Sequence, residues 1–235
     1  MRHNEKPMKI SPLSLTLGVT ALSLFGCGGS GVSTITETKL RVVHASPNAP
    51  NVDVVVGSAV AFSNVAYFSE GVKTIPAGTT QVRVRATGGT TDVINASPIL
   101  ATGNYTTILA VNNLAQIEPL VVTEPDQGPG AGQARVRLVH ASPSTGNVDI
   151  YVTAPTATLP STPTVANVPF KGVSTALTVA AGNYRVRITP AGTPGTVAID
   201  TGTITLASNS VTIAAALDKA SGGSPLTARL YTTSY

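Results

Sequence analysis

The 235-residue sequence has little charge, few aromatic side chains and almost no cysteine. Charged residues make up 11%, less than half the usual globular share, which excludes a charge-rich disordered tail. One cysteine excludes a disulfide scaffold. The 17 prolines argue against a coiled coil or helical bundle. What remains is a β-rich globular chain, long enough for one or two domains.

The N-terminal residues form a positive segment followed by a short apolar one. Arg2, Lys6 and Lys9 precede an apolar run, Leu13 to Phe25. This run is too short to cross a bilayer of ~30 Å as a helix and is typical of a signal-peptide core. It ends in Leu24-Phe25-Gly26-Cys27, which resembles the bacterial lipobox.

Cys27 is the only cysteine, so it cannot form an internal disulfide. Its glycine neighbours disfavour the alternative of a buried free thiol. The lipobox resemblance implies a diacylglyceryl thioether and an N-acyl chain (palmitate, for example), and several acyl chains anchor a protein stably. We therefore expect a lipoprotein of the bacterial cell envelope, on the outer membrane in a Gram-negative cell because Gly28 follows. Either Met1 or Met8 can be the start.

The rest of the chain repeats itself. Residues 41–56 read RVVHASPNAPNVDVVV, and residues 137–152 read RLVHASPSTGNVDIYV. Further on, Val82-Arg83-Val84-Arg85 matches Tyr184-Arg185-Val186-Arg187. The repeated unit is about 90 residues long, which is the size of a domain rather than of a solenoid repeat.

These signals predict five segments. They are a lipoprotein signal peptide (1–26), a lipidated cysteine and tether (27–38), a first β-sandwich (39–123), a Pro/Gly linker (124–133) and a second β-sandwich (134–235). The linker offers few apolar residues, so we expect few contacts between the two copies and independent folding of residues 38–124.

Period-two alternation predicts the fold class. Val52, Val54 and Val56 alternate with Asp53 and Val55, and turn signals recur every 8–12 residues. We expect an all-β chain of two tandem antiparallel β-sandwiches, immunoglobulin- or transthyretin-like, with no helix after residue 27. The Pro/Thr-rich stretch 154–166 of the second copy is predicted to be a loop.

The repeated HASP…NVD motif, followed by a Pro-Ala-Gly turn and a Val-Arg-Val-Arg strand, resembles the bacterial domain of unknown function DUF4397. The resemblance covers about residues 40–122 and 135–232. It implies a secreted or surface-attached β-sandwich, often in tandem copies. It implies no established activity, so it transfers no catalytic residues.

Each copy carries the three residue types of a hydrolase triad: His44, Ser46 and Asp53 in the first, and His140, Ser142 and Asp149 in the second. Ser46 lies two residues from His44 and directly before a proline, and no G-x-S-x-G elbow is present. We expect the serine to cap its own loop. One His and one Asp per copy are too few for a metal site, so no metal and no cofactor are expected.

The histidines follow an apolar alternation. Leu40 and Val42 precede His44 at spacing two, which points the imidazole inward at the end of the strand. An inward neutral imidazole needs a hydrogen-bond partner, and a loop carbonyl is the nearest acceptor. We therefore expect His44 and His140 to stabilise the Ala-Ser-Pro turn.

Six arginines occupy outward strand positions: Arg41, Arg83, Arg85, Arg137, Arg185 and Arg187. We expect a solvated face with cross-strand pairs to Asp53 and Asp149. An anionic-ligand or polysaccharide surface is the alternative. Nucleic-acid binding is not expected, because stacking aromatic side chains are not interleaved with these cations.

The sequence predicts a non-catalytic, lipid-anchored envelope protein that displays two β-sandwiches for binding or structural support. A carbohydrate- or envelope-polymer-binding module is the first alternative, with Tyr67, Phe68, Tyr151 and Phe170 as aromatic candidates. An envelope hydrolase that uses His44 and Asp53 is the second. An open cleft that joins His, Ser and Asp would favour the hydrolase, and a flat patch of exposed tyrosines would favour the binding module.

Overall fold

The computed structural model describes residues 36–235, which belong to one compact unit. The predicted all-β sandwich class is confirmed: the residues form strands, apart from loops and one short 3-10 helix, η1 (Leu114–Gln116). The predicted signal peptide, Cys27 and most of the tether lie outside the described residues. No helix within residues 36–235 is long and apolar enough to cross a membrane.

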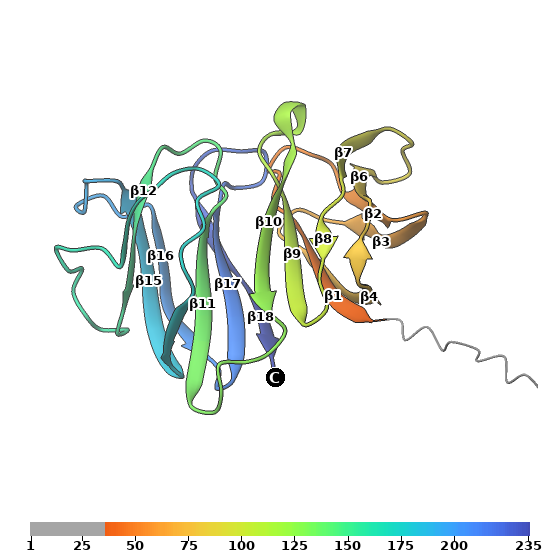
Figure 1. Cartoon of the computed structure of the whole chain (residues 1–235). Coiled ribbons are helices and arrows are strands. Elements are labelled where there is room, and N and C mark those ends of the chain that lie inside the picture. The colour runs from red at the N-terminus through yellow and green to blue at the C-terminus, as the bar shows by residue number, and fades with distance from the viewer. Residues whose placement is uncertain (1–35) are drawn as a thin grey trace, which may run out of the picture. The chain divides into compact units, whose positions relative to one another are not determined.

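The first repeat folds into two four-stranded sheets, with orders β10-β9-β1-β4 and β3-β2-β6-β7 (Figure 1). Its strands are β1 (Glu37–His44), β2 (Val52–Val56), β3 (Ala59–Val65), β4 (Glu70–Pro76), β6 (Val82–Ala86), β7 (Asp92–Ala96), β9 (Asn104–Val111) and β10 (Glu118–Pro125). A two-stranded ribbon adds β5 (Gly78–Thr79) and β8 (Ile99–Leu100). β1 pairs antiparallel with β4 and parallel with β9.

The second repeat has the same strand order, in sheets β18-β17-β11-β14 and β13-β12-β15-β16. Its strands are β11 (Gln133–His140), β12 (Val148–Thr153), β13 (Val165–Val168), β14 (Leu177–Ala180), β15 (Gly182–Pro190), β16 (Ile199–Leu206), β17 (Ser210–Leu217) and β18 (Thr227–Ser234). β11 pairs parallel with β17, as β1 does with β9. The duplicated sequence therefore forms duplicated topology.

Each repeat has an apolar core between its own two sheets. Leu40 and Val42 are alternate residues of β1, so both point to the same side of the strand, into the core of the first repeat. In β11, Val136 and Leu138 do the same in the second repeat. These cores are what the alternation in the sequence predicts.

A third core joins the two repeats. It lies between the sheet that contains β1 and the sheet that contains β11. Its buried members are Val43, Ala45, Leu109, Val111 and Val122 from the first repeat, and Val139, Ala141, Ile213, Ala215, Leu217 and Tyr231 from the second. The expectation of few contacts between the copies is therefore wrong.

The reason lies in strands that are buried on both faces. All eight residues of β17 are buried, which is typical of a strand covered by another layer on each side. The composition of the linker could not show this. β10 continues to Pro125 and β11 begins at Gln133, so the segment between these strands is only 126–132.

The two His-Ala-Ser-Pro loops lie at the same end of the molecule. The Ser221 N–H donates to the carbonyl of Pro47 at 2.7 Å, which links the first repeat's loop to the loop that follows β17. We call this the loop end; it comprises residues 45–51, 112–117, 141–147 and 218–226.

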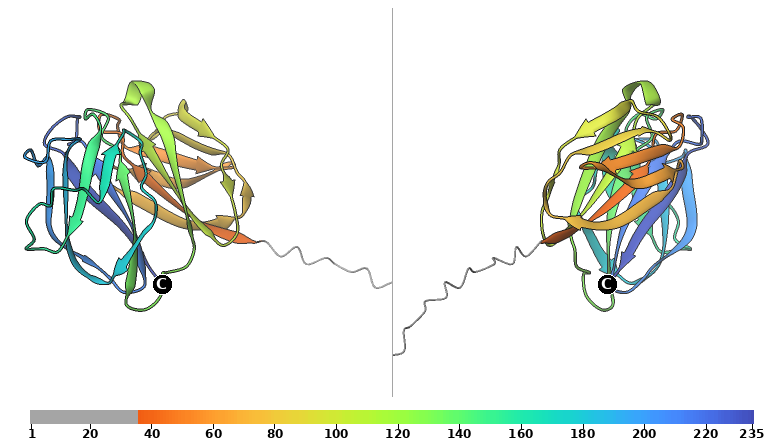
Figure 2. Two further views of the ribbon diagram at one scale, coloured as in Figure 1. Left: turned by 60° about the vertical axis from the view of Figure 1, so that its left-hand side comes forward. Right: turned by 90° about the vertical axis from the view of Figure 1, so that its right-hand side faces the viewer.

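The first residues of β1 lie at the opposite end, near the C-terminus (Figure 2). There, the Lys39 ammonium lies 5.4 Å from the centre of the Tyr235 ring. The Thr38 hydroxyl donates to the carbonyl of Asn104 at 2.8 Å. We call this the tether end, because the N-terminal residues join the sandwich here.

Candidate functional site

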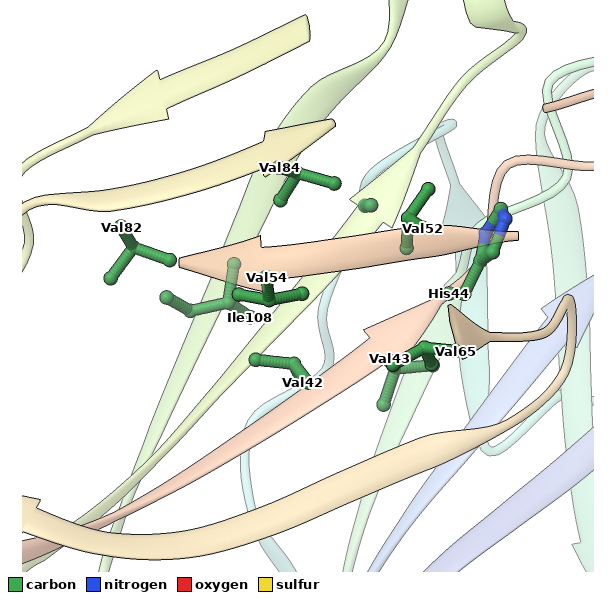
Figure 3. Close-up of a pocket in the computed structure, with 10 residues that line it drawn as sticks. Val42, Val43, His44, Val52, Val54, Val65, Val82, Val84 and Ile108 are labelled. Atoms are coloured by element: carbon green, nitrogen blue, oxygen red, sulfur yellow. The ribbon is translucent and has the colours of Figure 1, made fainter. Parts of the chain in front are cut away.

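His44 closes its own loop. Its side chain is 1% exposed, and its Nε2 lies 2.9 Å from the carbonyl oxygen of Pro50. Its Nδ1 accepts from the Ser46 N–H at 3.3 Å, so the proton belongs on Nε2, which donates to Pro50. The imidazole thus joins the start and end of the loop, and Figure 3 shows it at the strand end beside core valines.

His140 repeats this arrangement in the second repeat. It is fully buried, its Nε2 lies 2.9 Å from the carbonyl oxygen of Gly146, and its Nδ1 accepts from the Ser142 N–H at 3.4 Å. Burial lowers the pKa of His44 and of His140, and the loop carbonyls oppose this only in part. Both rings are therefore neutral at neutral pH.

An aromatic ring stands edge-on to each histidine. Tyr67 lies 5.7 Å from His44 and Phe170 lies 6.3 Å from His140, between ring centres. These rings help to separate the imidazoles from solvent. The sequence predicted inward rings and loop-carbonyl acceptors, but not these aromatic partners, which lie far along the chain.

The repeated aspartates hold turns together. Asp53 accepts from the backbone N–H groups of Asn64 at 2.9 Å and Gly88 at 3.1 Å, and these bonds lower its pKa. Asp149 accepts from Asn167 at 2.7 Å and Gly192 at 2.8 Å. The prediction that these aspartates form ion pairs with the arginines is therefore wrong, because their carboxylates accept hydrogen bonds from backbone N–H groups instead.

The triad residues do not form a catalytic relay. His44 points into the core between the sheets, whereas Asp53 alternates with the core residues Val52 and Val54 and so points away from it. The buried Ser46 hydroxyl has no hydrogen-bond partner among residues 36–235. Because His44 and Ser46 are both buried, these two side chains do not share an open cleft with Asp53.

In the second repeat, the serine binds a carboxylate that sequence reasoning missed. The hydroxyl of Ser142 donates to Asp218 Oδ1, and the hydroxyl of Ser144 donates to the same oxygen at 2.8 Å. Asp218 Oδ2 accepts from the Gly223 N–H at 3.0 Å. Asp218 directly follows β17, and Asn112 directly follows the equivalent strand β9 of the first repeat. This difference between the two copies was the one feature of the sequence that could have indicated a role for Asp218.

Three of the six arginines do not lie on the solvated sheet face that the sequence predicted. Arg41 is 3% exposed and reaches across to the second repeat, and Arg187 is 6% exposed. Arg137 pairs with the buried Glu124 and donates to the carbonyl of Ser174 at 2.6 Å. Their surroundings are interface and loop backbone rather than a ligand surface.

Arg83 and Arg185 do lie on outer faces, but they pair with other aspartates. Arg83 lies 3.4 Å from Asp92. Arg185 forms a two-point pair with Asp200, which lowers the pKa of Asp200 to about 2. These pairs neutralise charge on the sheet faces.

The four aromatic candidates do not form an exposed patch. Tyr151 is 1% exposed. Tyr67 is half-buried and donates to the carbonyl of Asp218 at 2.9 Å, and Phe68 stacks beneath the guanidinium of Arg229 at 4.5 Å. Phe170 is half-buried beside His140. These four rings therefore pack within one repeat or between the two repeats.

The interior of the first repeat holds one small cavity, lined by His44 and core valines (Figure 3). Its volume is about 10 Å³, which is at the limit for one water molecule. Within residues 36–235, no cluster of three or more His, Cys, Asp or Glu side chains could hold a metal ion.

A larger groove opens at the loop end of the first repeat. Its volume is about 310 Å³, and it is lined by Pro50, Val52, Ala86, Gly89, Thr90, Thr91, Val93 and Leu114. None of these side chains is charged or aromatic. The loop-end groove offers aliphatic surface and two threonine hydroxyls, but no acid, base or nucleophile pair for catalysis.

Residues 38–151 match the family described as "Domain of unknown function (DUF4397)", so a DUF4397 domain is found at these residues. The match takes in the whole first repeat and continues through β11 to the fourth residue of β12. It therefore includes both His-Ala-Ser-Pro loops. No curated protein matches the chain.

Several solved structures are distantly similar. The Bacillus anthracis TIE protein is 13% identical, with 79% of this chain and 34% of that one covered and a TM-score of 0.26, so this chain spans about a third of its length. The carbohydrate-binding module CBMbc (family CBM26) from Eubacterium rectale Amy13K, in complex with maltoheptaose, is 11% identical (84% and 98% covered, TM-score 0.27). The tip fimbrial protein Mfa3 from Porphyromonas gingivalis is 10% identical (85% and 100% covered, TM-score 0.28).

Proposed function

We propose that this chain, which carries a DUF4397 domain at residues 38–151, is a non-catalytic, lipid-anchored protein of the bacterial cell envelope. It displays two fused β-sandwiches for binding or structural support. The observation that carries the proposal is the opposite placing of the tether end and the loop end. A chain anchored through Cys27 enters β1 at Glu37 and presents both His-Ala-Ser-Pro loops away from the membrane.

The third core supports a display role. Because Val43 and Leu109 pack against Ile213 and Tyr231, the two repeats form one body instead of two domains on a flexible linker. A rigid body holds its loop end at a fixed distance from its tether end. This arrangement suits a spacer or a scaffold that presents loops to a partner.

The buried histidines support the absence of catalysis. A general base needs contact with a substrate proton. In both imidazoles, each of the two ring nitrogens instead forms a hydrogen bond with the backbone of its own loop. A hydrolase based on His44 and Asp53 would need both side chains in one cleft. Instead, His44 on β1 points into the core between the two sheets, and Asp53 on β2, in the other sheet, points away from that core.

A module that binds envelope polymer is the second candidate, and the loop-end groove favours it. The groove lies at the displayed end and offers Thr90 and Thr91 hydroxyls beside aliphatic surface. Titration calorimetry with soluble peptidoglycan fragments tests this function. A Leu114→Asp variant should abolish any heat of binding that the parent protein gives.

Metabolic labelling with a radioactive fatty acid tests the anchor. The parent protein should incorporate label and sediment with membranes, because an acylated cysteine holds the chain there. Cys27→Ala should lose the label and appear in the soluble fraction, whereas the matched control Gly29→Ala should behave like the parent. A Cys27→Ala protein that stays labelled and membrane-bound would refute the lipid anchor.

A further inference from the structure

The second repeat carries an insertion that the first repeat lacks. In the first repeat, β2 and β3 are joined by the two-residue turn Gly57-Ser58. In the second repeat, β12 and β13 are joined by residues 154–164, which read APTATLPSTPT. The insertion contains no charged residue, and its prolines at positions 155, 160 and 163 disfavour pairing with a neighbouring strand.

Buried arginine holds this insertion against the outer face of its sheet. Arg187 donates to the carbonyls of Ala157 at 3.0 Å and Thr158 at 3.2 Å, and to the hydroxyl of Thr153 at 2.9 Å. Tyr151 lies opposite Arg187 in the β12–β15 pair and is 1% exposed. The backbone of the insertion is therefore fixed in place, in contrast to a free linker.

The fixed backbone presents a row of hydroxyl groups to solvent. Thr156, Thr158, Ser161 and Thr162 are all exposed, and their hydroxyls have no hydrogen-bond partner among the residues the structure describes. By contrast, Thr164 accepts from the Val152 N–H at 2.9 Å and so helps to close the base of the insertion. Within residues 36–235, these four hydroxyls therefore contribute no hydrogen bond to the fold.

We propose that this hydroxyl row is a site of O-linked glycosylation. Segments that are rich in proline, serine and threonine and expose their hydroxyls are typical acceptors of O-linked sugars. The inference is independent of the lipid anchor. Sugars here would cover the outer face of the second repeat.

The reaction requires a sugar activated as a diphosphate, either nucleotide- or lipid-linked. The threonine or serine oxygen forms a bond to the anomeric carbon. The bond between that carbon and the diphosphate oxygen breaks, and the diphosphate departs with its electron pair. A base in the transferase takes the hydroxyl proton. The product is an O-glycoside, and no atom of this chain other than the hydroxyl hydrogen is lost.

Peptide mass spectrometry of the protein purified from its native cells tests the proposal. Trypsin releases residues 138–171 as one peptide, because no Lys or Arg lies between Arg137 and Lys171. Its mass should exceed the sequence mass by one or more sugar residues. Electron-based fragmentation should place them on the four exposed hydroxyls, and not on the buried Ser142.

One quadruple variant and one internal control complete the test. In the quadruple variant Thr156→Val, Thr158→Val, Ser161→Ala, Thr162→Val, the peptide should return to its sequence mass. The intact variant protein should also migrate faster on a gel than the parent protein. The peptide of residues 86–135 carries the exposed Thr87, Thr90 and Thr91 without the proline context and should be unmodified. A native peptide only at its sequence mass, or sugars that persist in the quadruple variant, would overturn the proposal.

Discussion

Arg41 donates a hydrogen bond to the backbone carbonyl of Tyr231 at 3.0 Å, which joins β1 of the first repeat to β18 of the second. Its guanidinium also donates to the Thr233 hydroxyl at 2.6 Å. Arg41 Nε lies 2.7 Å from Glu70 Oε2, as an ion pair rather than an aligned hydrogen bond. One buried cation thus serves both repeats, at a position where the sequence suggested a solvated side chain.

Replacing this arginine should weaken the whole body. Arg41→Ala removes the donor that the first repeat gives to the Tyr231 carbonyl, and leaves Glu70 without its cation. We expect a loss of roughly 2–3 kcal/mol in the free energy of unfolding, measured by urea denaturation. Arg185, which pairs with Asp200 on an outer face, is the matched control, and Arg185→Ala should lower the urea midpoint less than Arg41→Ala because solvent screens its ion pair. Equal midpoints for the two variants would contradict the interface role.

The third core predicts one unfolding transition for the two repeats. Calorimetry of residues 36–235 should give a single cooperative peak, because the core from Val43 to Tyr231 must be lost when either repeat unfolds. Residues 36–125 alone should bind a hydrophobic dye and self-associate, since they expose the face around Leu109 and Val111. Two separate peaks, together with a monomeric fragment that binds no dye, would show that the repeats are independent.

The buried histidines predict a loss of stability in mild acid. Their pKa values in the folded protein lie below the ordinary value of 6.5, so between the two values the unfolded chain binds more protons. Stability is therefore fully present above pH 6.5 and falls as the pH drops toward the lowered pKa. Urea midpoints at pH 7.5 and 5.5 measure this loss.

The double variant His44→Ala, His140→Ala is the control for that pH dependence. It should be less stable at pH 7.5, by roughly 1–3 kcal/mol for each loop carbonyl left without its donor. It should also lose most of the difference between the two pH values. A double variant with the full parental pH dependence would assign that dependence to other groups.

Asp218 should stabilise the second repeat's loop through its negative charge. In Asp218→Asn, the amide can accept from the Ser142 and Ser144 hydroxyls, but its NH₂ then faces the Gly223 N–H, so two donors oppose each other. We expect a loss of roughly 1–3 kcal/mol by urea denaturation. The reciprocal change Asn112→Asp in the first repeat should bring no gain, because Asn112 donates to Glu118 Oε1 at 3.3 Å and a carboxylate in its place would face a like charge. An unchanged Asp218→Asn midpoint would contradict this role.

Period-two alternation could predict the sandwich class and the inward histidines, because both depend on neighbours along one strand. It could not predict the third core. In β1, Arg41 and Val43 share the face opposite Leu40 and Val42, and an arginine on that face is equally compatible with solvent and with a polar interface. The continuous apolar runs 108–111 in β9 and 214–217 in β17 were the signs of strands that are covered on both faces.

The candidate site was predictable to a similar extent. The repeated motif correctly placed His44 and His140 against their own loop carbonyls. The partners of the aspartates were missed, since backbone donors 11 and 35 residues away from Asp53 bind its carboxylate in place of Arg85, its cross-strand neighbour. Contacts of this kind depend on how the hairpins pack against one another, and a local pattern in the sequence does not indicate that packing.

The most direct test of the display account is the distance of each end of the body from the membrane. The lipidated protein is reconstituted in vesicles that contain acceptor-labelled lipid, with a donor dye on a single added cysteine. Cys27 does not compete for the dye when its sulfur is in a thioether. Thr102→Cys marks the tether end, and Ala220→Cys marks the loop end; both positions are exposed. The account predicts strong energy transfer from Thr102→Cys and weak transfer from Ala220→Cys, whereas equal transfer from both, or stronger transfer from Ala220→Cys, would contradict it.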